Sequence, residues 1–248
     1  MLTAFTADLH MHTCLSPCGD LLMSPKKITA RVLERSLDII AITDHNSVEN
    51  AQAVMKAAAG MNVVVLPGME VCTREEIHVL AIFENLKSAL ELQDIVYAHL
   101  TGENDPEVFG EQIVANENDE VEGSQKKFFI GAVDLPLEEL EKSIHRLNGM
   151  VIASHIDRES YSVIGQLGFL PETARFDALE ISSNISDTEA EERFKKYRGH
   201  TFIRNSDAHS LDDIGKNTSK LLMERPSFTE VRMALRNENG RAVIRYHA

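Results

Sequence analysis

The stretch Thr3-Ala-Phe-Thr-Ala-Asp-Leu-His-Met-His12 decides how the chain is expected to fold. Residues 3–9 are predicted to form a β-strand, and His10 and His12 follow it directly. Because side chains alternate along an extended chain, both imidazoles leave on one face and can bind one ion together.

The same arrangement recurs along the chain, with a ligand-type side chain beside a short apolar run. The candidates are His10, His12, Asp20, His45, Glu70, His78, His155, Asp207 and His209. A single His-x-His pair would be weak support, because such pairs are common by chance. Nine candidates that all lie beside predicted strands indicate ligands that the fold brings together. This pattern predicts a multinuclear metal centre and metal-assisted hydrolysis.

Predicted strands and helices alternate along the chain. The strands cover residues 3–9, 37–43, 62–67, 76–83, 150–153, 177–181, 201–204 and 217–223, with a short one near Val243. The helices cover residues 24–36, 46–59, 86–100, 136–147, 187–197 and 227–237. Such alternation predicts an α/β fold with a parallel sheet, either closed as a barrel or open.

The positions of the candidate ligands favour the barrel. Most of them lie just past the C-terminal end of a strand, and convergence from many strands suits the C-terminal face of a barrel. An open sheet instead gathers its site at one switch point between two strands. His78 is the exception, because it lies at the beginning of its predicted strand.

The chain is predicted to form a single domain over residues 1–248. Its 248 residues are 43% hydrophobic, which suffices for one substantial core, and no linker or repeat divides it. Residues 103–127 interrupt the alternation as a small acidic insertion, in which 109–115 and 121–130 are expected to form a hairpin. This insertion is either a solvated hairpin or a lid at the rim of the barrel.

The formal net charge of −14 argues against binding to long nucleic acid, which needs a cationic surface. A small anionic substrate or the end of a short oligonucleotide stays compatible, because bound metals supply local positive charge. No run of about eighteen apolar residues is present, so a transmembrane helix is excluded. The N-terminus has no basic start and no long apolar core, so no signal peptide is expected.

The three cysteines, Cys14, Cys18 and Cys72, cannot all pair, which favours a reducing cytoplasm. They lie near candidate ligands, so an extra metal or a redox role competes with the interpretation as small buried thiols. The candidate ligands are imidazoles and carboxylates, which suit Zn²⁺, Mn²⁺ or Fe²⁺. Asp8 and Asp44 precede candidate histidines and are expected to accept the proton of the second ring nitrogen.

Taken in order from Asp8 to His209, these motifs resemble the PHP (polymerase and histidinol phosphatase) superfamily of metal-dependent phosphoesterases. The resemblance implies a distorted (β/α)7, TIM-like barrel that holds three divalent metal ions. It also implies which residues bind each ion. The first metal would be bound by His10, His12, Glu70 and Asp207. Glu70 would bridge to the second metal, which His78 and His155 complete, and the third would be bound by Asp20, His45 and His209. Asp20 is otherwise a loop or capping aspartate.

A mechanism for ester hydrolysis follows from these ligands as a hypothesis. A hydroxide that bridges two metals would attack phosphorus in line. Arg158 would neutralise the phosphoryl oxygens by bidentate hydrogen bonding, unless it is a solvated surface arginine. Asp207 or a metal-bound water would protonate the leaving group. Asn184 either reaches the pocket or is an ordinary loop residue.

We therefore expect a cytoplasmic enzyme that hydrolyses small phosphate monoesters, with nucleotides among the candidate substrates and no membrane partner. The first alternative is a nuclease, acting as a 5′–3′ exonuclease on short oligonucleotides. The second is a non-catalytic metal-binding module, against which the full set of candidate ligands argues. His99, His145, His200 and His247 lack such a motif and are not expected to be functional.

Overall fold

A computed structural model describes residues 1–244, so that His247 lies outside the described residues. Within residues 1–244, nine strands form one curled sheet and two more form a separate hairpin. The sheet contains β1 (Thr3–Asp8), β2 (Ile39–Ile42), β3 (Val64–Cys72), β4 (His78–Ile82), β7 (Met150–Ala153), β8 (Ala178–Ile181), β9 (Phe202–Arg204), β10 (Ser219–Met223) and β11 (Ala242–Ile244). The hairpin consists of β5 (Ile113–Ala115) and β6 (Val121–Ser124).

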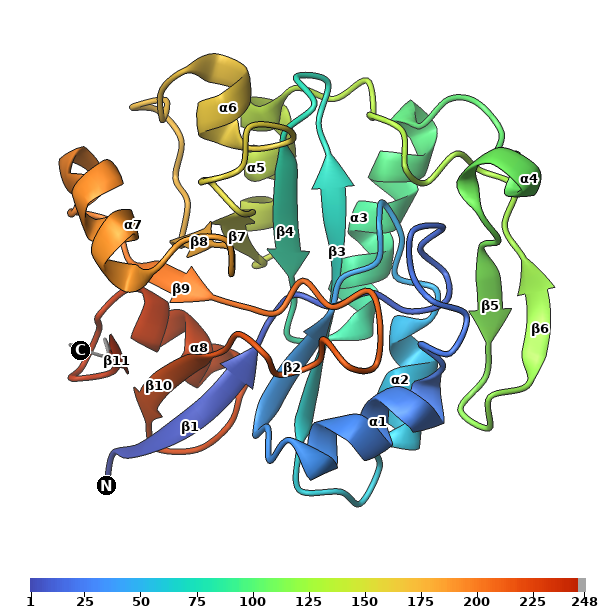
Figure 1. Cartoon of the computed structure of the whole chain (residues 1–248), viewed down its shortest axis with the longest axis horizontal. Helices are drawn as coiled ribbons and strands as arrows, with labels where there is room; N and C mark the ends of the chain where they lie inside the picture. The colour runs from blue at the N-terminus through green and yellow to red at the C-terminus, as the bar shows by residue number, and fades with distance from the viewer. Residues whose placement is uncertain (245–248) are drawn as a thin grey trace.

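Helices connect most of these strands and lie around the sheet (Figure 1). The longer ones are α1 (Pro25–Glu34), α3 (Leu86–His99), α5 (Leu137–Arg146) and α8 (Phe228–Leu235). The shorter ones are α2 (Ala51–Ala57), α4 (Pro106–Phe109), α6 (Val163–Leu167), α7 (Asp187–Arg193) and the 3₁₀ turn η1 (Lys195–Tyr197). Helix α1 begins at Pro25 as its sequence predicts, because proline is well suited to the first helical turn.

The helix predicted over residues 46–59 is wrong at its beginning. Asn46 has a left-handed backbone, with φ of 52°, and its side-chain amide donates to the carbonyl oxygens of Phe129 at 2.7 Å and Gly131 at 2.8 Å. Asparagine tolerates this conformation better than most residues. The helix therefore starts only at Ala51, and the preceding residues line the loop after β2.

The sheet follows the order β11-β10-β1-β2-β3-β4-β7-β8-β9 and curls into a nearly closed barrel (Figure 1). An isolated parallel bridge between Met11 and Ala208 joins the segment after β1 to the segment after β9. The expected distorted, TIM-like α/β barrel is thus confirmed. The expectation of an all-parallel sheet is wrong, because β4 is antiparallel to both β3 and β7, and β10 is antiparallel to β1.

The reversed direction of β4 explains the odd position of His78. This residue opens β4 and pairs with Cys72, the last residue of β3. Since β4 runs against its neighbours, its first residue lies at the edge where the parallel strands end. His78 therefore reaches the same edge as the ligand candidates that follow strands.

Alternate residues of the strands face two different apolar clusters. One cluster joins Ile39, Leu80 and Ile152 to the apolar face of α8. The other joins their neighbours in sequence, such as Ile40, to the outer helices. This two-sided burial matches the nearly continuous apolar runs of the predicted strands.

The insertion forms the expected hairpin, although β5 and β6 are shorter than predicted. In Figure 1 the hairpin and α4 lie to one side of the barrel. The hairpin is fixed to the barrel, because the Ile113 N–H donates to the Cys14 carbonyl at 2.9 Å and the Ala115 N–H to the Asn50 side chain at 3.0 Å. None of the helices in residues 1–244 combines the length and apolarity needed to cross a bilayer.

Candidate metal centre

Six histidines and two acids converge at the edge of the barrel where most strands end. Seven of these eight side chains are buried or nearly so, and only the side chain of His209 is substantially exposed, at 32%. They are His10 and His12 after β1, His45 after β2, Glu70 in β3, His78 at the start of β4, His155 after β7, and Asp207 with His209 after β9.

The first group of donor atoms has the spacing of a metal site. His10 Nε2 lies 3.3 Å from His12 Nε2, 3.2 Å from Asp207 Oδ1 and 3.3 Å from Glu70 Oε1. His12 Nε2 lies 3.3 Å from the same Asp207 oxygen. Ligand atoms about 2.1 Å from a tetrahedral ion lie about 3.4 Å apart. These four side chains therefore fit one divalent ion.

Glu70 lies at the centre of the whole cluster. Its Oε1 is 3.1 Å from His78 Nδ1 and 3.4 Å from His155 Nε2, and its Oε2 is 3.3 Å from His45 Nδ1. Within residues 1–244, Oε1 of Glu70 and Oδ1 of Asp207 are buried without a hydrogen-bond partner. Such orphaned acceptors are costly in a protein interior, and a bound cation would satisfy them.

A third group joins His12, His45 and His209, whose donor atoms lie within 4.8 Å of one another. Asp20 is absent from the groups of donor atoms found among residues 1–244. Its exposed carboxylate accepts from the N–H of Leu22 at 2.8 Å, as in an ordinary loop turn. Its backbone N–H donates to the carbonyl of His209 at 2.8 Å.

Two buried carboxylates fix the tautomers of His10 and His12, but only one was expected to take part. Glu180 accepts from His10 Nδ1 at 3.1 Å, which leaves Nε2 as the free lone pair. Ser16 accepts from His12 Nδ1 at 3.0 Å while donating its own proton to Asp44 at 2.7 Å. Such support raises the basicity of the coordinating nitrogen.

The direct contacts expected from Asp8 and Asp44 to histidines are therefore wrong. Asp8 accepts backbone N–H groups of Ser206 at 2.9 Å and Gly215 at 3.1 Å, so it holds the loop after β9. Asp44 acts on His12 only through Ser16. Glu180 was not among the residues predicted from the sequence. The available signal was an acid inside the apolar strand Ala178-Leu-Glu-Ile181, since a buried charge needs a partner.

The electrostatics of the cluster favour cation binding. The pKa of His12 is lowered to about 4, mainly by burial and to a smaller extent by the nearby charge of His209, so the ring is neutral at pH 7. Burial would lower the pKa of His10, but Glu180, Asp207 and Glu70 outweigh it and raise that pKa well above its usual value. Burial would likewise raise the pKa of Asp207, but His10 and His12 hold it well below its usual value. Concentrated negative charge around these imidazoles suits a divalent ion, which would displace the second ring proton of His10 on binding.

Backbone strain is concentrated at this site. His155, Tyr161 and Asp207 have φ values of 29°, 58° and 50°, in a region that side chains other than glycine rarely adopt. Each such backbone conformation lowers the stability of the folded state by on the order of 1–3 kcal/mol, and it persists only where surrounding contacts hold it in place. Such strain is characteristic of sites where side-chain direction matters more than local stability.

Arg158 lies at the mouth of the cluster. Its Nη2 atom is 2.7 Å from Asp207 Oδ2, and 37% of its side chain is exposed. It lines a cavity of about 460 Å³ together with His78, His155, Tyr161 and Asn184. The cavity therefore joins two candidate ligands to the solvent through a cationic side chain.

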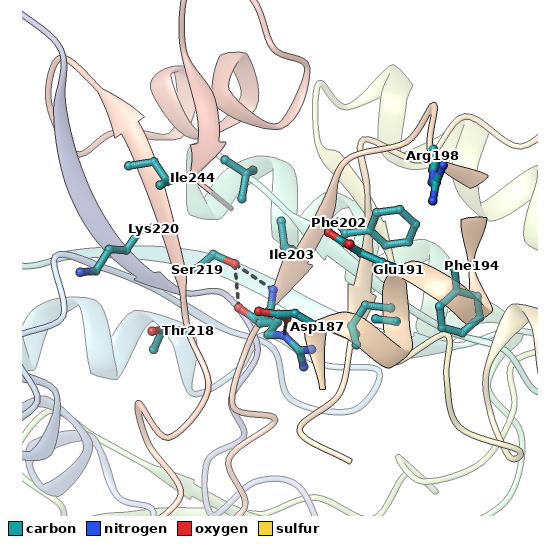
Figure 2. A pocket seen from close by; sticks show the side chains of 14 residues that line it. Asp187, Glu191, Phe194, Arg198, Phe202, Ile203, Thr218, Ser219, Lys220 and Ile244 are labelled. Atoms are coloured by element: carbon teal, nitrogen blue, oxygen red, sulfur yellow. Dashed lines mark hydrogen bonds and ion pairs between the residues drawn. The ribbon is translucent and has the colours of Figure 1, made fainter. Parts of the chain in front are cut away.

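Another cavity, of about 300 Å³, lies between α7, β9, β10 and β11 (Figure 2). The Ser219 hydroxyl is hydrogen-bonded to the backbone of Arg204, whose guanidinium forms an ion pair with Asp187 at 2.6 Å. None of the candidate ligands in residues 1–244 lines this cavity. It is therefore separate from the cluster.

The free cysteines take no part in the donor groups found among residues 1–244. Cys14 and Cys72 are buried, as small thiols often are, whereas Cys18 is exposed. Burial raises the pKa of Cys14 and Cys72 to about 12, which disfavours the thiolate needed for metal binding or redox chemistry.

The family model of the PHP domain matches residues 8–170, about two thirds of the chain. The chain therefore belongs to the PHP family, as its motifs indicated. Its donor atoms from His10, His12 and Glu70, and from His45, Glu70 and His78, lie close enough together to hold a metal ion.

Three further comparisons extend this result. The Bacillus subtilis (strain 168) protein YqxK is 29% identical over 110 residues, which cover 42% of this chain and 28% of YqxK. The lesion-specific endonuclease Q of Pyrococcus furiosus has the same fold, with a TM-score of 0.75, 21% identity, and coverage of 97% of this chain and 58% of that one. A proposed metal-dependent phosphoesterase of Bifidobacterium adolescentis gives a TM-score of 0.59 with 16% identity, over 94% of this chain and 96% of that one.

Proposed function

We propose that this protein hydrolyses small phosphate monoesters at a centre of three divalent metal ions. The observation that carries the proposal is the convergence of six imidazoles on two carboxylates, Glu70 and Asp207, each with one buried oxygen that lacks a hydrogen-bond partner within residues 1–244. Zn²⁺, Mn²⁺ and Fe²⁺ all accept this donor set. When bound, such ions lower the pKa of water and supply a nucleophile near neutral pH.

The distances support a specific division of the ligands. One ion would be held by His10, His12, Glu70 and Asp207, and a second by Glu70 with His78 and His155. For the third, the spacing supports His45 and His209, because the one free nitrogen of His12 is already used for the first ion. Asp20 would join that group only after its side chain leaves the Leu22 N–H.

Arg158 is proposed to bind the phosphoryl group. Its guanidinium lies at the cavity wall beside His155 and Asp207, where it can offer paired N–H donors to two phosphoryl oxygens. The low pKa of Asp207 supports an ionised carboxylate, hence a ligand and a partner for Arg158 rather than the acid that protonates the leaving group. That proton then comes from water.

A small ester fits the site better than a long polymer. The cavity beside the cluster has a volume of about 460 Å³, in the range of small-molecule sites. The net charge of −14 would repel a polyanion beyond its terminal nucleotides. The three free cysteines support a reducing, cytoplasmic environment for the enzyme.

A nuclease acting on short oligonucleotides is the second candidate. The observation that favours it is the similarity in fold to endonuclease Q, which has been crystallised with a DNA duplex containing an abasic lesion. This chain covers 58% of that protein, so the activity of the whole endonuclease comes to this chain only as a proposal.

The test combines metal analysis with a substrate screen of monoesters, diesters and 5′-labelled oligonucleotides. Release of inorganic phosphate from monoesters alone supports the phosphatase, and mononucleotides from oligomers support the nuclease. His10→Ala is expected to lower turnover by at least about hundredfold and to reduce metal content. His99→Ala, which removes a ring whose Nδ1 is hydrogen-bonded to the Ile95 carbonyl, is the matched control. Unchanged turnover and metal content in His10→Ala would falsify the proposal.

A further inference from the structure

An aromatic side chain continues the metal cluster toward the solvent. Tyr161 lies in the loop between β7 and α6, and its ring stacks on the imidazole of His78. The ring centroids are 4.6 Å apart and the planes are inclined by 24°. Tyr161 is nevertheless 43% exposed. His78 occupies one face of the ring, so a ligand could stack only on the other face.

The backbone fixes Tyr161 in this position. Its left-handed φ of 58° is held because its carbonyl accepts the N–H of His78 at 2.8 Å. The same loop is tied to the end of β8, where Asp157 accepts both the N–H of Ser182 at 2.7 Å and its hydroxyl at 2.6 Å. The ring is thus presented by a rigid loop, which reduces the entropy lost when a ligand binds to it.

The surroundings of the ring suit the organic part of a substrate. Tyr161 lines the same cavity as Arg158 and Asn184, beside two of the candidate ligands. Arg158 provides positive charge near the cluster, and the Asn184 amide can both donate and accept hydrogen bonds. The cavity therefore combines the Arg158 guanidinium, a flat aromatic wall and an amide able to contact the edge of a ring, with Asp157 and Glu159 also in its lining.

We infer that Tyr161 is a specificity-determining residue that stacks on the base of a nucleoside monophosphate whose phosphate lies at the metal cluster. This inference rests on the proposed phosphatase function. A ring stacked on the outer side of Tyr161 lies about 9 Å from the His78 imidazole, roughly two ring separations. An aryl group bonded directly to the phosphate is too short to reach that position, whereas a ribose supplies the required spacer.

The test compares kcat/KM for adenosine 5′-monophosphate with kcat/KM for ribose 5-phosphate, which lacks only the base. Tyr161→Leu is expected to lower the ratio of the two by about tenfold to hundredfold, the usual effect of losing one base–aromatic stack. Tyr161→Phe keeps the ring and is expected to keep the ratio within about threefold. Phe169→Leu changes an aromatic side chain that is 55% exposed outside the cavity and serves as the matched control.

An equal loss for both substrates in Tyr161→Leu would overturn the inference, because it would point to a general disturbance of His78. A large loss on phenyl phosphate, with none on the nucleotide, would overturn it as well. If the metal-loaded protein releases phosphate from none of the esters, the proposed function fails separately. Calorimetric binding of the same two ligands then decides the role of Tyr161, because only a preference for the nucleotide that Tyr161→Leu removes supports stacking.

Discussion

Both carboxylate oxygens of Glu180 lie 3.1 Å from Nδ1 of His10, and the pair is completely buried. The same carboxylate accepts the N–H of His155 at 2.9 Å and the amide of Asn205 at 2.8 Å. Glu180 therefore orients the side chain of one candidate ligand and the backbone of another. It connects β8, which carries no candidate ligand, to the cluster.

Glu180→Gln is expected to weaken metal binding by about tenfold to hundredfold, because an amide neither fixes the His10 tautomer nor strengthens its Nε2 as a ligand. The measurement is metal affinity by competition with a chelator, together with the melting temperature. Glu122→Gln, at an exposed position in the insertion, is the control. Equal metal affinities in wild type and Glu180→Gln would show that His10 needs no such support.

Ser16→Ala is expected to lower metal affinity and turnover by about tenfold. Ser16 transmits the charge of Asp44 to His12, and its loss leaves the buried Asp44 carboxylate short of one donor. Ser24→Ala is the matched control, because the buried Ser24 hydroxyl has no hydrogen-bond partner within residues 1–244. If both alanine variants lose the same metal affinity, the hydrogen bonds from His12 through Ser16 to Asp44 do not explain the loss.

Much of this site could be predicted from sequence because its ligands lie next to strands. The spacing of His10 and His12, and of Asp207 and His209, follows from the alternation of an extended chain. Eight of the nine candidates converge, and the exception, Asp20, lies in a loop whose conformation depends on local hydrogen bonds. A loop aspartate gives no periodic signal of its direction.

What sequence could not supply were the pairings between distant segments. Nothing local indicates that β4 runs antiparallel, although that direction alone brings His78 to the correct edge. The acid that pairs with His10 Nδ1 lies 170 residues away in sequence, whereas the sequence indicated the nearby Asp8. Asp8 instead accepts the backbone N–H groups of Ser206 and Gly215 and so supports the loop after β9.

Removal of metal is expected to destabilise the folded protein as well as to stop turnover. Glu70, Glu180 and Asp207 concentrate buried negative charge at the site. An ion that binds only the folded state, at a free concentration 1,000 times its Kd, adds about 4 kcal/mol to the free energy of unfolding. For a chain of this size the melting temperature should fall by roughly 8–16 °C on treatment with a chelator. Scanning calorimetry before and after re-addition of Zn²⁺ or Mn²⁺ measures this shift.

His10→Ala is the control for that experiment, since a protein that binds less metal should respond less to the chelator. A chelator that strips all metal without moving the melting temperature of the wild-type protein would contradict the prediction. A shift of equal size in His10→Ala would instead show that the stabilising ion binds elsewhere.

The last prediction concerns stability at acid pH, far from the cluster. Asp177 accepts the N–H of Val151 at 2.9 Å and forms an ion pair with Arg236 at 2.7 Å, while its side chain is 4% exposed. Burial would raise the pKa of Asp177, but His145, the Val151 N–H and Arg236 together lower it. A lowered pKa in the folded state means that the stabilisation is complete above the unfolded value of about 3.8 and is lost as the pH falls further.

Asp177→Asn is therefore expected to cost about 1–3 kcal/mol in the free energy of unfolding at pH 7 and less at pH 3. Urea unfolding of both proteins at the two pH values measures the difference. Asp212→Asn, which removes a partner of Arg31 whose side chain is 82% exposed, should cost under about 0.5 kcal/mol at either pH. If Asp177→Asn lowers the free energy of unfolding equally at pH 3 and pH 7, the negative charge of Asp177 does not contribute to stability.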